Sequence, residues 1–223
     1  MILSANQPYL LPYFPYWQLI HAADRFLLGD DYAFIRHGWI TRNRIRVNDR
    51  EQYLFLRVKG MSRNKLIKDT ELCPFHAETV LRTVEMAYHK APFFVDGYAL
   101  AQRVFDCPER NLTSFLAASI REVCAYLGID TPIGYISELE GNHLLRREER
   151  IYDFCHRLGG DEYINAIGGQ GLYRFDEFRR QGIRLGFLHS EAGLPPLSIL
   201  DAAMHHSREE LHFLLDQYSL IHG

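Results

Sequence analysis

The chain has 223 residues, a length typical of one large domain, and we expect residues 1–223 to form a single domain. Its hydrophobic fraction of 47% and charged fraction of 24% are ordinary for a globular protein and exclude disordered, collagen-like and disulfide-scaffold classes. The net charge of −3 provides no overall attraction for nucleic acid, so we expect no nucleic-acid partner and only a local site for any anion.

The first thirty residues predict a βαβ unit. An apolar strand at residues 2–5 and a proline-containing loop precede a helix over Tyr16–Ala23, and a second apolar strand covers Arg25–Gly29. A strand that is apolar on both faces is typical of the interior of a parallel sheet. Ligands of open α/β sheets bind at the carboxyl ends of such strands, so Gln7 and Asp30–Asp31 are expected on one rim.

A β-hairpin excursion is expected at about residues 34–58, where a basic stretch precedes a strand of alternating polarity. Later helices are expected from residue 75, around 98–105, and over 112–127, 144–158, 173–181, 199–205 and 209–217, with strands over 133–136, 162–166 and 184–188. The pattern predicts an α/β fold with a mainly parallel open sheet and a helical second half.

The hairpin segment carries the most specific chemical signal. Arg42, Arg44 and Arg46 alternate and would share one face of an extended strand. With Arg36 they could hold phosphate or carboxylate through bidentate guanidinium contacts, and Trp39 could stack on a base or sugar. The alternative is a solvated hairpin whose arginines pair with surface acids.

Carboxylates at the end of the second strand are candidate catalytic groups. Asp30 and Asp31 could act as a general base, position a sugar hydroxyl or bind a metal, although an Asp at a strand end often only starts a turn. The stretch Asn165–Gly171 lies between a predicted strand and helix, where backbone amides can hold an anion. Such glycine-rich turns also occur without a ligand.

Asp201 and His205 would share a helix face, but two ligands on one helix are too few for a metal site, and we predict none. Ser198 as the helix cap, with Asp201 as its acidic partner, is the structural alternative. His21 is interpreted as a half-buried structural histidine. The four cysteines contain no CxxC pair and are expected to be reduced core thiols.

The start of the chain lacks a basic region followed by a long apolar run, and no stretch of about 18 apolar residues occurs. We therefore expect a cytoplasmic, soluble protein without membrane insertion. The sequence identifies neither a cofactor nor an oligomeric state.

Motifs along most of the chain carry a family resemblance. They are Gln7-Pro8-Tyr9, Asp30-Asp31, Gly38-Trp39-Ile40, Arg42-Asn43-Arg44-Ile45, Lys90-Ala91-Pro92-Phe93, Glu149-Arg150-Ile151, Tyr163-Ile164-Asn165-Ala166, Gly168-Gly169-Gln170, Leu172-Tyr173 and Leu197-Ser198-Ile199-Leu200-Asp201. With these motifs the chain resembles the WbqC-like family of bacterial proteins associated with O-antigen and other surface-polysaccharide gene clusters. It departs at Pro15, where the family usually has Gly, and near Arg36-His37, where Lys is usual.

The resemblance implies a role in building or modifying surface glycans, with a transferase as one expectation, but it implies no particular reaction. The opening topology is also similar to that of nucleotidylyltransferases, whose HxGH signature this chain lacks. In the enzyme hypothesis, Asp30 or Asp31 is the base, and an anionic activated donor, such as a nucleotide sugar or a carrier-linked acyl group, is the substrate. Its candidate binding residues are Gln7, Tyr9, Arg36, Trp39, Arg42, Asn43, Arg44, Asn165, Gly168, Gly169, Gln170, Tyr173 and Asp201.

The second hypothesis is a non-catalytic protein that binds a glycan precursor or a partner enzyme through exposed aromatic rings. The aromatic share of 13% is high, and several rings stand in turns beside polar motifs. We expect an aromatic rim made of Tyr9, Tyr13, Phe14, Tyr16, Trp39 and Tyr173.

Overall fold

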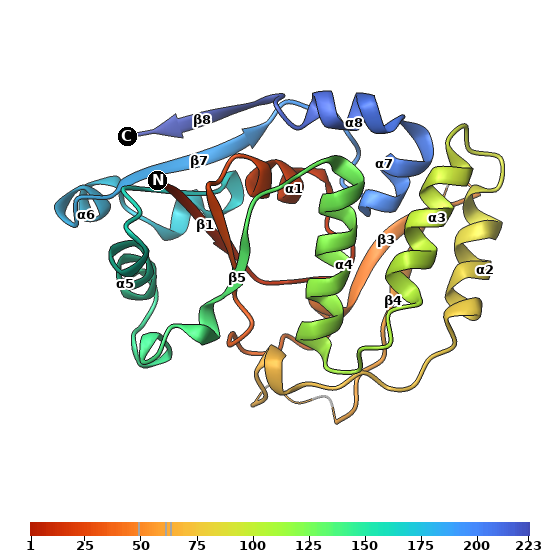
Figure 1. Cartoon of the computed structure of the whole chain (residues 1–223), viewed down its shortest axis with the longest axis horizontal. Helices are drawn as coiled ribbons and strands as arrows, with labels where there is room; N and C mark the ends of the chain where they lie inside the picture. The colour runs from red at the N-terminus through yellow and green to blue at the C-terminus, as the bar shows by residue number, and fades with distance from the viewer. Residues whose placement is uncertain (49, 61, 63) are drawn as a thin grey trace.

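A six-stranded sheet forms one half of the computed structural model, which describes residues 1–48, 50–60, 62 and 64–223 (Figure 1). The strands lie in the order β5-β2-β1-β6-β7-β8, and all pairs are parallel except β7 with β8. Their bounds are β1 Ile2–Asn6, β2 Arg25–Leu28, β5 Ile133–Tyr135, β6 Glu162–Ala166, β7 Arg184–Ser190 and β8 Tyr218–His222. The expected α/β class, mainly parallel sheet and N-terminal βαβ unit are therefore confirmed.

Helices cover both faces of this sheet because its strands alternate apolar side chains between the faces. On one face Phe26 of β2 packs edge-on against Tyr16 of α1, which spans Phe14–His21. On the other face Tyr163 of β6 packs against Phe154 and Phe178. These two rings belong to α5 (Glu148–Leu158) and α6 (Phe175–Arg180).

The other half of the molecule holds a helical cluster and a separate hairpin (Figure 1). The helices are α2 Ala77–Tyr88, α3 Phe94–Phe105, α4 Leu112–Leu127, α7 Ile199–His205 and α8 Arg208–Leu214. The hairpin pairs β3 (Arg42–Val47) with β4 (Arg50–Phe55) in antiparallel register, which confirms the excursion predicted at about residues 34–58. Short 3₁₀ turns cover Trp39–Thr41, Ile67–Asp69, Ile136–Glu138, Asn142–Leu144 and Ile167–Leu172. No helix among the described residues is long and apolar enough to span a membrane.

Local chemistry explains why α4 has its predicted bounds. Helix α4 begins where the Asn111 side chain accepts a hydrogen bond from the Ser114 amide, and it ends at Gly128, whose φ is 73°. Strand β8 was not predicted, because the last element expected from the sequence was a helix over residues 209–217. Its five residues lie at the sheet edge and pair with β7, a partner that local sequence patterns do not reveal.

The expected aromatic rim is largely wrong. Tyr9, Phe14 and Tyr16 are buried, with at most 8% of their surface exposed, whereas Tyr13 and Trp39 are exposed. The proline-containing loop folds inward because its backbone is held by the hairpin segment: the Leu10 amide donates to the Ile40 carbonyl at 3.0 Å. The loop rings are consequently core residues, and Tyr9 contacts Tyr16 edge-on at 5.1 Å between centroids.

Candidate functional site

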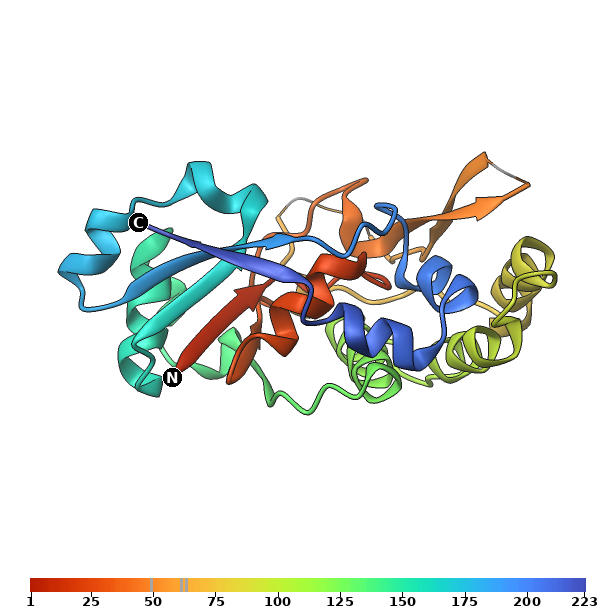
Figure 2. The same cartoon turned by 90° about the horizontal axis from the view of Figure 1, so that it is seen from above.

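The strands β1 and β6 lie side by side at the point where the chain reverses its direction of travel across the sheet. From β1 the chain moves to β2 and β5 on one side, then returns to β6 and β7 on the other. Figure 2 shows both β1 and β6 ending near the middle of the molecule. Gln7 follows β1, Asp30–Asp31 follow β2, and Asn165 ends β6, so these predicted residues gather at one sheet edge. Crevices at this position are the usual ligand sites of open α/β sheets.

Both predicted catalytic carboxylates are buried and already hydrogen-bonded. Asp30 accepts from the Ser137 backbone amide at 3.1 Å and from its hydroxyl at 2.6 Å. Asp31 accepts two contacts from Nη2 of Arg150, at 2.8 and 2.6 Å. Asp30 is therefore held by a residue 107 positions away and Asp31 by one 119 positions away, whereas the turn interpretation expected local hydrogen bonds.

Arg150 is held from three sides. Besides the contact with Asp31, its Nε donates to Oδ1 of Asn142 at 2.8 Å, and the guanidinium lies over the Tyr32 ring, 5.1 Å from its centroid. Nη1 makes no hydrogen bond within the part of the chain that the structure describes. A guanidinium fixed in this way loses little side-chain entropy when it binds an anion.

Arg150 lines a cavity of about 820 Å³, which we call the carboxyl-edge pocket. Its walls come from the segment after β2, the start of α5, the segment between β6 and α6, and α6 itself. They are Tyr32, Arg147, Glu148, Arg150, Ile151, Gly171, Leu172, Tyr173, Arg174 and Glu177. Three arginines, two carboxylates and two tyrosine rings thus surround a space large enough for a nucleotide-sized ligand.

The backbone at the pocket entrance is strained. Arg147 precedes α5 with φ 48° and ψ −124°, a conformation that costs a non-glycine residue energy. It places the first turn of an eleven-residue helix at the pocket, with the amide groups and partial positive charge of a helix start.

The end of the predicted glycine-rich stretch, Gly171, and the two residues after it contribute to the other wall. Most of this stretch forms a 3₁₀ turn, Ile167–Leu172, between β6 and α6. A Cβ on Gly169 would lie 3.0 Å from Nδ2 of Asn165, so glycine lets the turn pack on this amide. Gly168 and Gln170 are exposed and lie outside the pocket lining. Burial raises the pKa of Tyr173, the charge of Glu148 raises it further, and a hydrogen bond with Asn165 lowers it.

Burial also raises the pKa of Tyr32 to about 12, against an opposing contribution from the Arg150 charge. Both pocket tyrosines therefore remain neutral near pH 7 and present ring faces and hydroxyl groups to a ligand.

The hairpin carries the predicted arginines on one face, as the alternation required: Asn43 and Ile45 are buried between them. Arg44 follows the structural alternative, because its Nη1 pairs with Glu51 at 2.8 Å and its Nη2 donates to the Pro196 carbonyl at 2.8 Å. The Asn43 amide donates to the Leu10 and Leu11 carbonyls at 3.1 and 2.7 Å, which joins the hairpin to the proline-containing loop. Asn43 thus has a structural role.

Other predicted residues lie apart from the carboxyl-edge pocket. Arg36 is exposed, and Trp39 is exposed beside the hairpin. Asp201 is buried and accepts a hydrogen bond from the Tyr88 hydroxyl at 3.0 Å. Ser198 caps α7 by accepting from the Leu200 amide, which confirms one half of the structural alternative, whereas the Asp201 carboxylate binds Tyr88 and not the cap. The structure therefore divides the predicted site into a sheet-edge group and a hairpin group.

The arginines that line this pocket are absent from the predicted site residues. Arg147 immediately precedes α5 and Arg150 lies in its first turn, and Glu149-Arg150-Ile151 already carried part of the family resemblance. Among the described residues, no group of three or more His, Cys, Asp or Glu side chains is arranged to hold a metal ion.

The strand order and this pocket define a class: a doubly wound α/β protein with an arginine-lined crevice where the strand order reverses. The turn after β1 contains prolines and no glycine, unlike the phosphate-binding turn of dinucleotide-binding members of that class. Residues 7–213 match the WbqC-like protein family, and the chain belongs to this family.

A curated relative is the uncharacterized protein Rv1507c of Mycobacterium tuberculosis (strain ATCC 25618 / H37Rv). It is 26% identical over 182 residues, which cover 78% of this chain and 76% of the relative. No solved structure matches the chain.

Proposed function

We propose that this protein binds an anionic activated donor, of the nucleotide-sugar or phosphate-linked acyl type, in the carboxyl-edge pocket and transfers the activated group. The observation that carries the proposal is the fixed guanidinium of Arg150, flanked in the same 820 Å³ cavity by Arg147 and Arg174. When the bond between the transferred group and the donor phosphate breaks, the phosphate gains charge. Preorganised arginines stabilise that charge in the transition state.

The remaining pocket residues suit the rest of such a substrate. Tyr32 and Tyr173 offer ring faces for a base or a sugar. The carboxylates of Glu148 and Glu177 suit sugar hydroxyls, and either one is placed to accept the proton of an attacking hydroxyl. In this scheme Asp31 is a positioning residue that orients Arg150, and Asp30 holds Ser137 at the sheet edge.

Calorimetric titration with a panel of nucleotide sugars and their nucleoside diphosphates tests donor binding. We expect binding that Arg147→Ala and Arg150→Met each weaken at least tenfold. Arg146→Ala is the matched control, because Arg146 is the adjacent exposed arginine and does not line the pocket. Failure of every donor to bind, or equal binding by the pocket variants and wild type, would overturn the proposal.

The proposed acceptor class is a precursor of bacterial surface polysaccharide, and this part rests on the association of similar proteins with surface-polysaccharide gene clusters. Mass spectrometry of the surface glycan from cells with and without the protein tests it, because the mass difference identifies the transferred group. Donor binding without any glycan difference would favour the non-catalytic alternative, a protein that binds a precursor in the same pathway.

A further inference from the structure

A second cavity, about 450 Å³, lies on the hairpin, and the donor proposal does not use it. We call it the hairpin pocket; its walls are His37, Thr41, Arg42, Tyr53, Phe55, Leu56, Arg57, Val58 and Cys73. None of these described lining residues is acidic, whereas three are arginine or histidine. The cavity therefore combines positive charge with aromatic walls.

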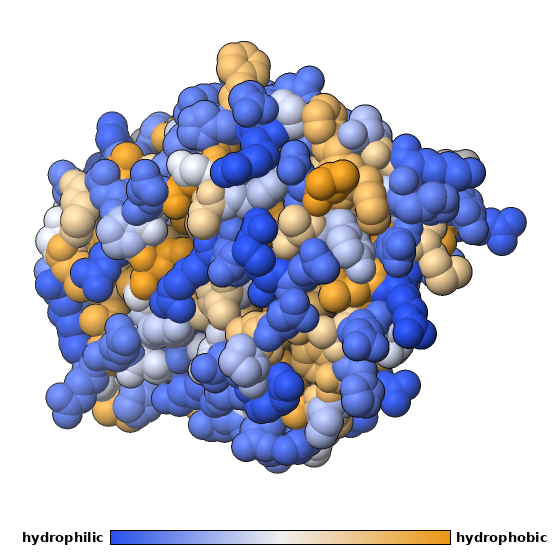
Figure 3. All heavy atoms as spheres, turned by 45° about the vertical axis from the view of Figure 1, so that its right-hand side comes forward, coloured by the Kyte–Doolittle hydropathy of each residue, from blue (hydrophilic) through white to orange (hydrophobic). Residues whose placement is uncertain are grey.

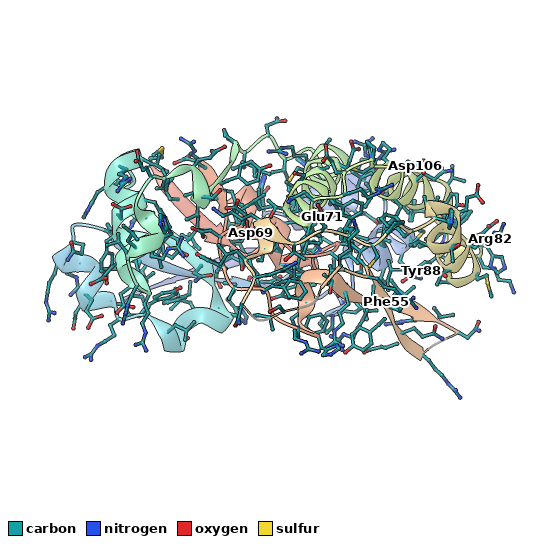
Figure 4. All side chains as sticks on the ribbon, turned by 90° about the horizontal axis from the view of Figure 1, so that it is seen from below. Phe55, Asp69, Glu71, Arg82, Tyr88 and Asp106 are labelled. Carbon is teal, nitrogen blue, oxygen red and sulfur yellow. The ribbon has the colours of Figure 1, made fainter. Side chains whose placement is uncertain are left out.

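Strand pairing explains this combination. Arg42 of β3 lies opposite Phe55 of β4, and Arg44 lies opposite Tyr53, so the basic and aromatic side chains interleave on one hairpin face. The Arg42 guanidinium stacks over the Tyr53 ring at 4.5 Å, and the Arg57 guanidinium lies over the Phe55 ring at 5.9 Å. Figure 4 shows Phe55 on the hairpin, and Phe55 shares a cavity lining with Thr79 and Val80 of the neighbouring helix α2.

These two arginines differ from Arg44, which Glu51 neutralises. Neither Arg42 nor Arg57 forms an ion pair with a residue that the structure describes, and Nε of Arg42 is buried there without a hydrogen-bond partner. Stacking occupies the face of a guanidinium and leaves its N–H edge available for phosphate oxygens. The guanidinium groups of Arg42 and Arg57 are therefore held in place by stacking and can bind an anionic ligand.

The rings are unusually accessible for large aromatic side chains: Tyr53 is 49% exposed and Phe55 54%. Trp39 lies beside them, with its ring centroid 6.4 Å from that of Tyr53. On the face of the molecule shown in Figure 3, hydrophobic residues form small groups between hydrophilic ones.

We propose that the hairpin pocket is a second binding site, which takes a phosphorylated ring compound with its phosphate on Arg42 and Arg57 and its ring on Tyr53 and Phe55. A nucleoside phosphate and a sugar phosphate share this chemistry. The proposal depends on hairpin residues alone, so it stands or falls separately from donor binding in the carboxyl-edge pocket.

Cys73 in the pocket wall provides a site-specific reporter, and Cys107 is a partly exposed thiol outside the pocket that serves as an internal control. The rate of alkylation at each cysteine is measured by mass spectrometry in the full chain at constant ionic strength. The probes are uridine diphosphate, glucose 1-phosphate and unphosphorylated uridine. We expect one or both phosphorylated probes to slow alkylation of Cys73 at least threefold, with Cys107 unchanged and uridine much less effective.

Arg42→Ala and Arg57→Ala should abolish the protection, and Arg50→Ala, which changes an exposed hairpin residue outside the pocket, should leave it intact. Arg42→Lys retains charge without the planar fork and should weaken protection while preserving the fold. Protection by uridine diphosphate alone identifies a nucleoside phosphate, and protection by glucose 1-phosphate alone identifies a sugar phosphate. Absence of protection by both, or equal protection in Arg42→Ala, would overturn the proposal.

Discussion

Replacing Asp31 by Asn tests the buried ion pair between Asp31 and Arg150, which holds Arg150 in the carboxyl-edge pocket. The side chain of Asp31 is 2% exposed and that of Arg150 is 14% exposed, so the substitution leaves a guanidinium largely desolvated without its counter-charge. Breaking a buried pair on one side typically costs about 3–5 kcal/mol. Arg150 retains its bond to Asn142 and some solvent, so we expect the lower end, about 3 kcal/mol.

For a domain of this size, 1 kcal/mol corresponds to a change of roughly 2–4 °C in Tm, so Asp31→Asn should lower Tm by roughly 6–12 °C. Urea denaturation followed by circular dichroism gives the free energy, and calorimetry gives Tm. Asp176→Asn is the control, because it breaks an exposed pair with Arg179 and should leave stability unchanged within error.

The double variant Asp31→Asn/Arg150→Met separates a lost charge partner from general damage to the fold. Removing both charges should recover most of the stability, since a buried pair replaced by apolar groups is often energetically neutral. A loss below about 1 kcal/mol in Asp31→Asn, or a double variant no more stable than the sum of two single losses, would refute the reasoning.

Burial raises the pKa of Cys124 and Cys155 from 9.0 to about 12, so the folded state binds these protons more tightly than the unfolded state. The free energy of unfolding should therefore fall as pH rises from about 9 toward 12, and at pH 8 a thiol reagent should reach these cysteines only after urea unfolding. Gly97→Ala should lower the free energy of unfolding by about 1–3 kcal/mol in urea titration, because the new Cβ would lie 2.7 Å from the Met204 sulfur of α7. This cost should exceed the gain from alanine as the better helix former. Equal or higher stability would contradict this packing. Tyr88→Phe should cost about 1–3 kcal/mol by the same assay, since it removes the hydroxyl bound to Asp201, and an unchanged midpoint would show that this hydrogen bond contributes nothing.

The predicted site shows which inferences local sequence supports. Arg42 and Arg44 were expected on one face because alternation along a strand is a local property, and the hairpin confirms it. The two arginines nevertheless make different contacts, and these depend on residues outside their own strand. Arg44 binds Glu51 and the Pro196 carbonyl, while Arg42 stacks on Tyr53. No spacing rule distinguishes these two outcomes.

The sequence by itself determined the α/β class, the βαβ start, the hairpin and most element positions, because hydrophobic periodicity and caps such as Asn111 act over a few residues. Only the tertiary structure decided that Asp31 binds Arg150, 119 positions away, and that Tyr9 is buried against Tyr16. Such contacts depend on which strands become neighbours and how helices cross them. That geometry comes from packing the whole chain, and it places both predicted bases in buried, hydrogen-bonded positions, Asp30 against Ser137 and Asp31 against Arg150.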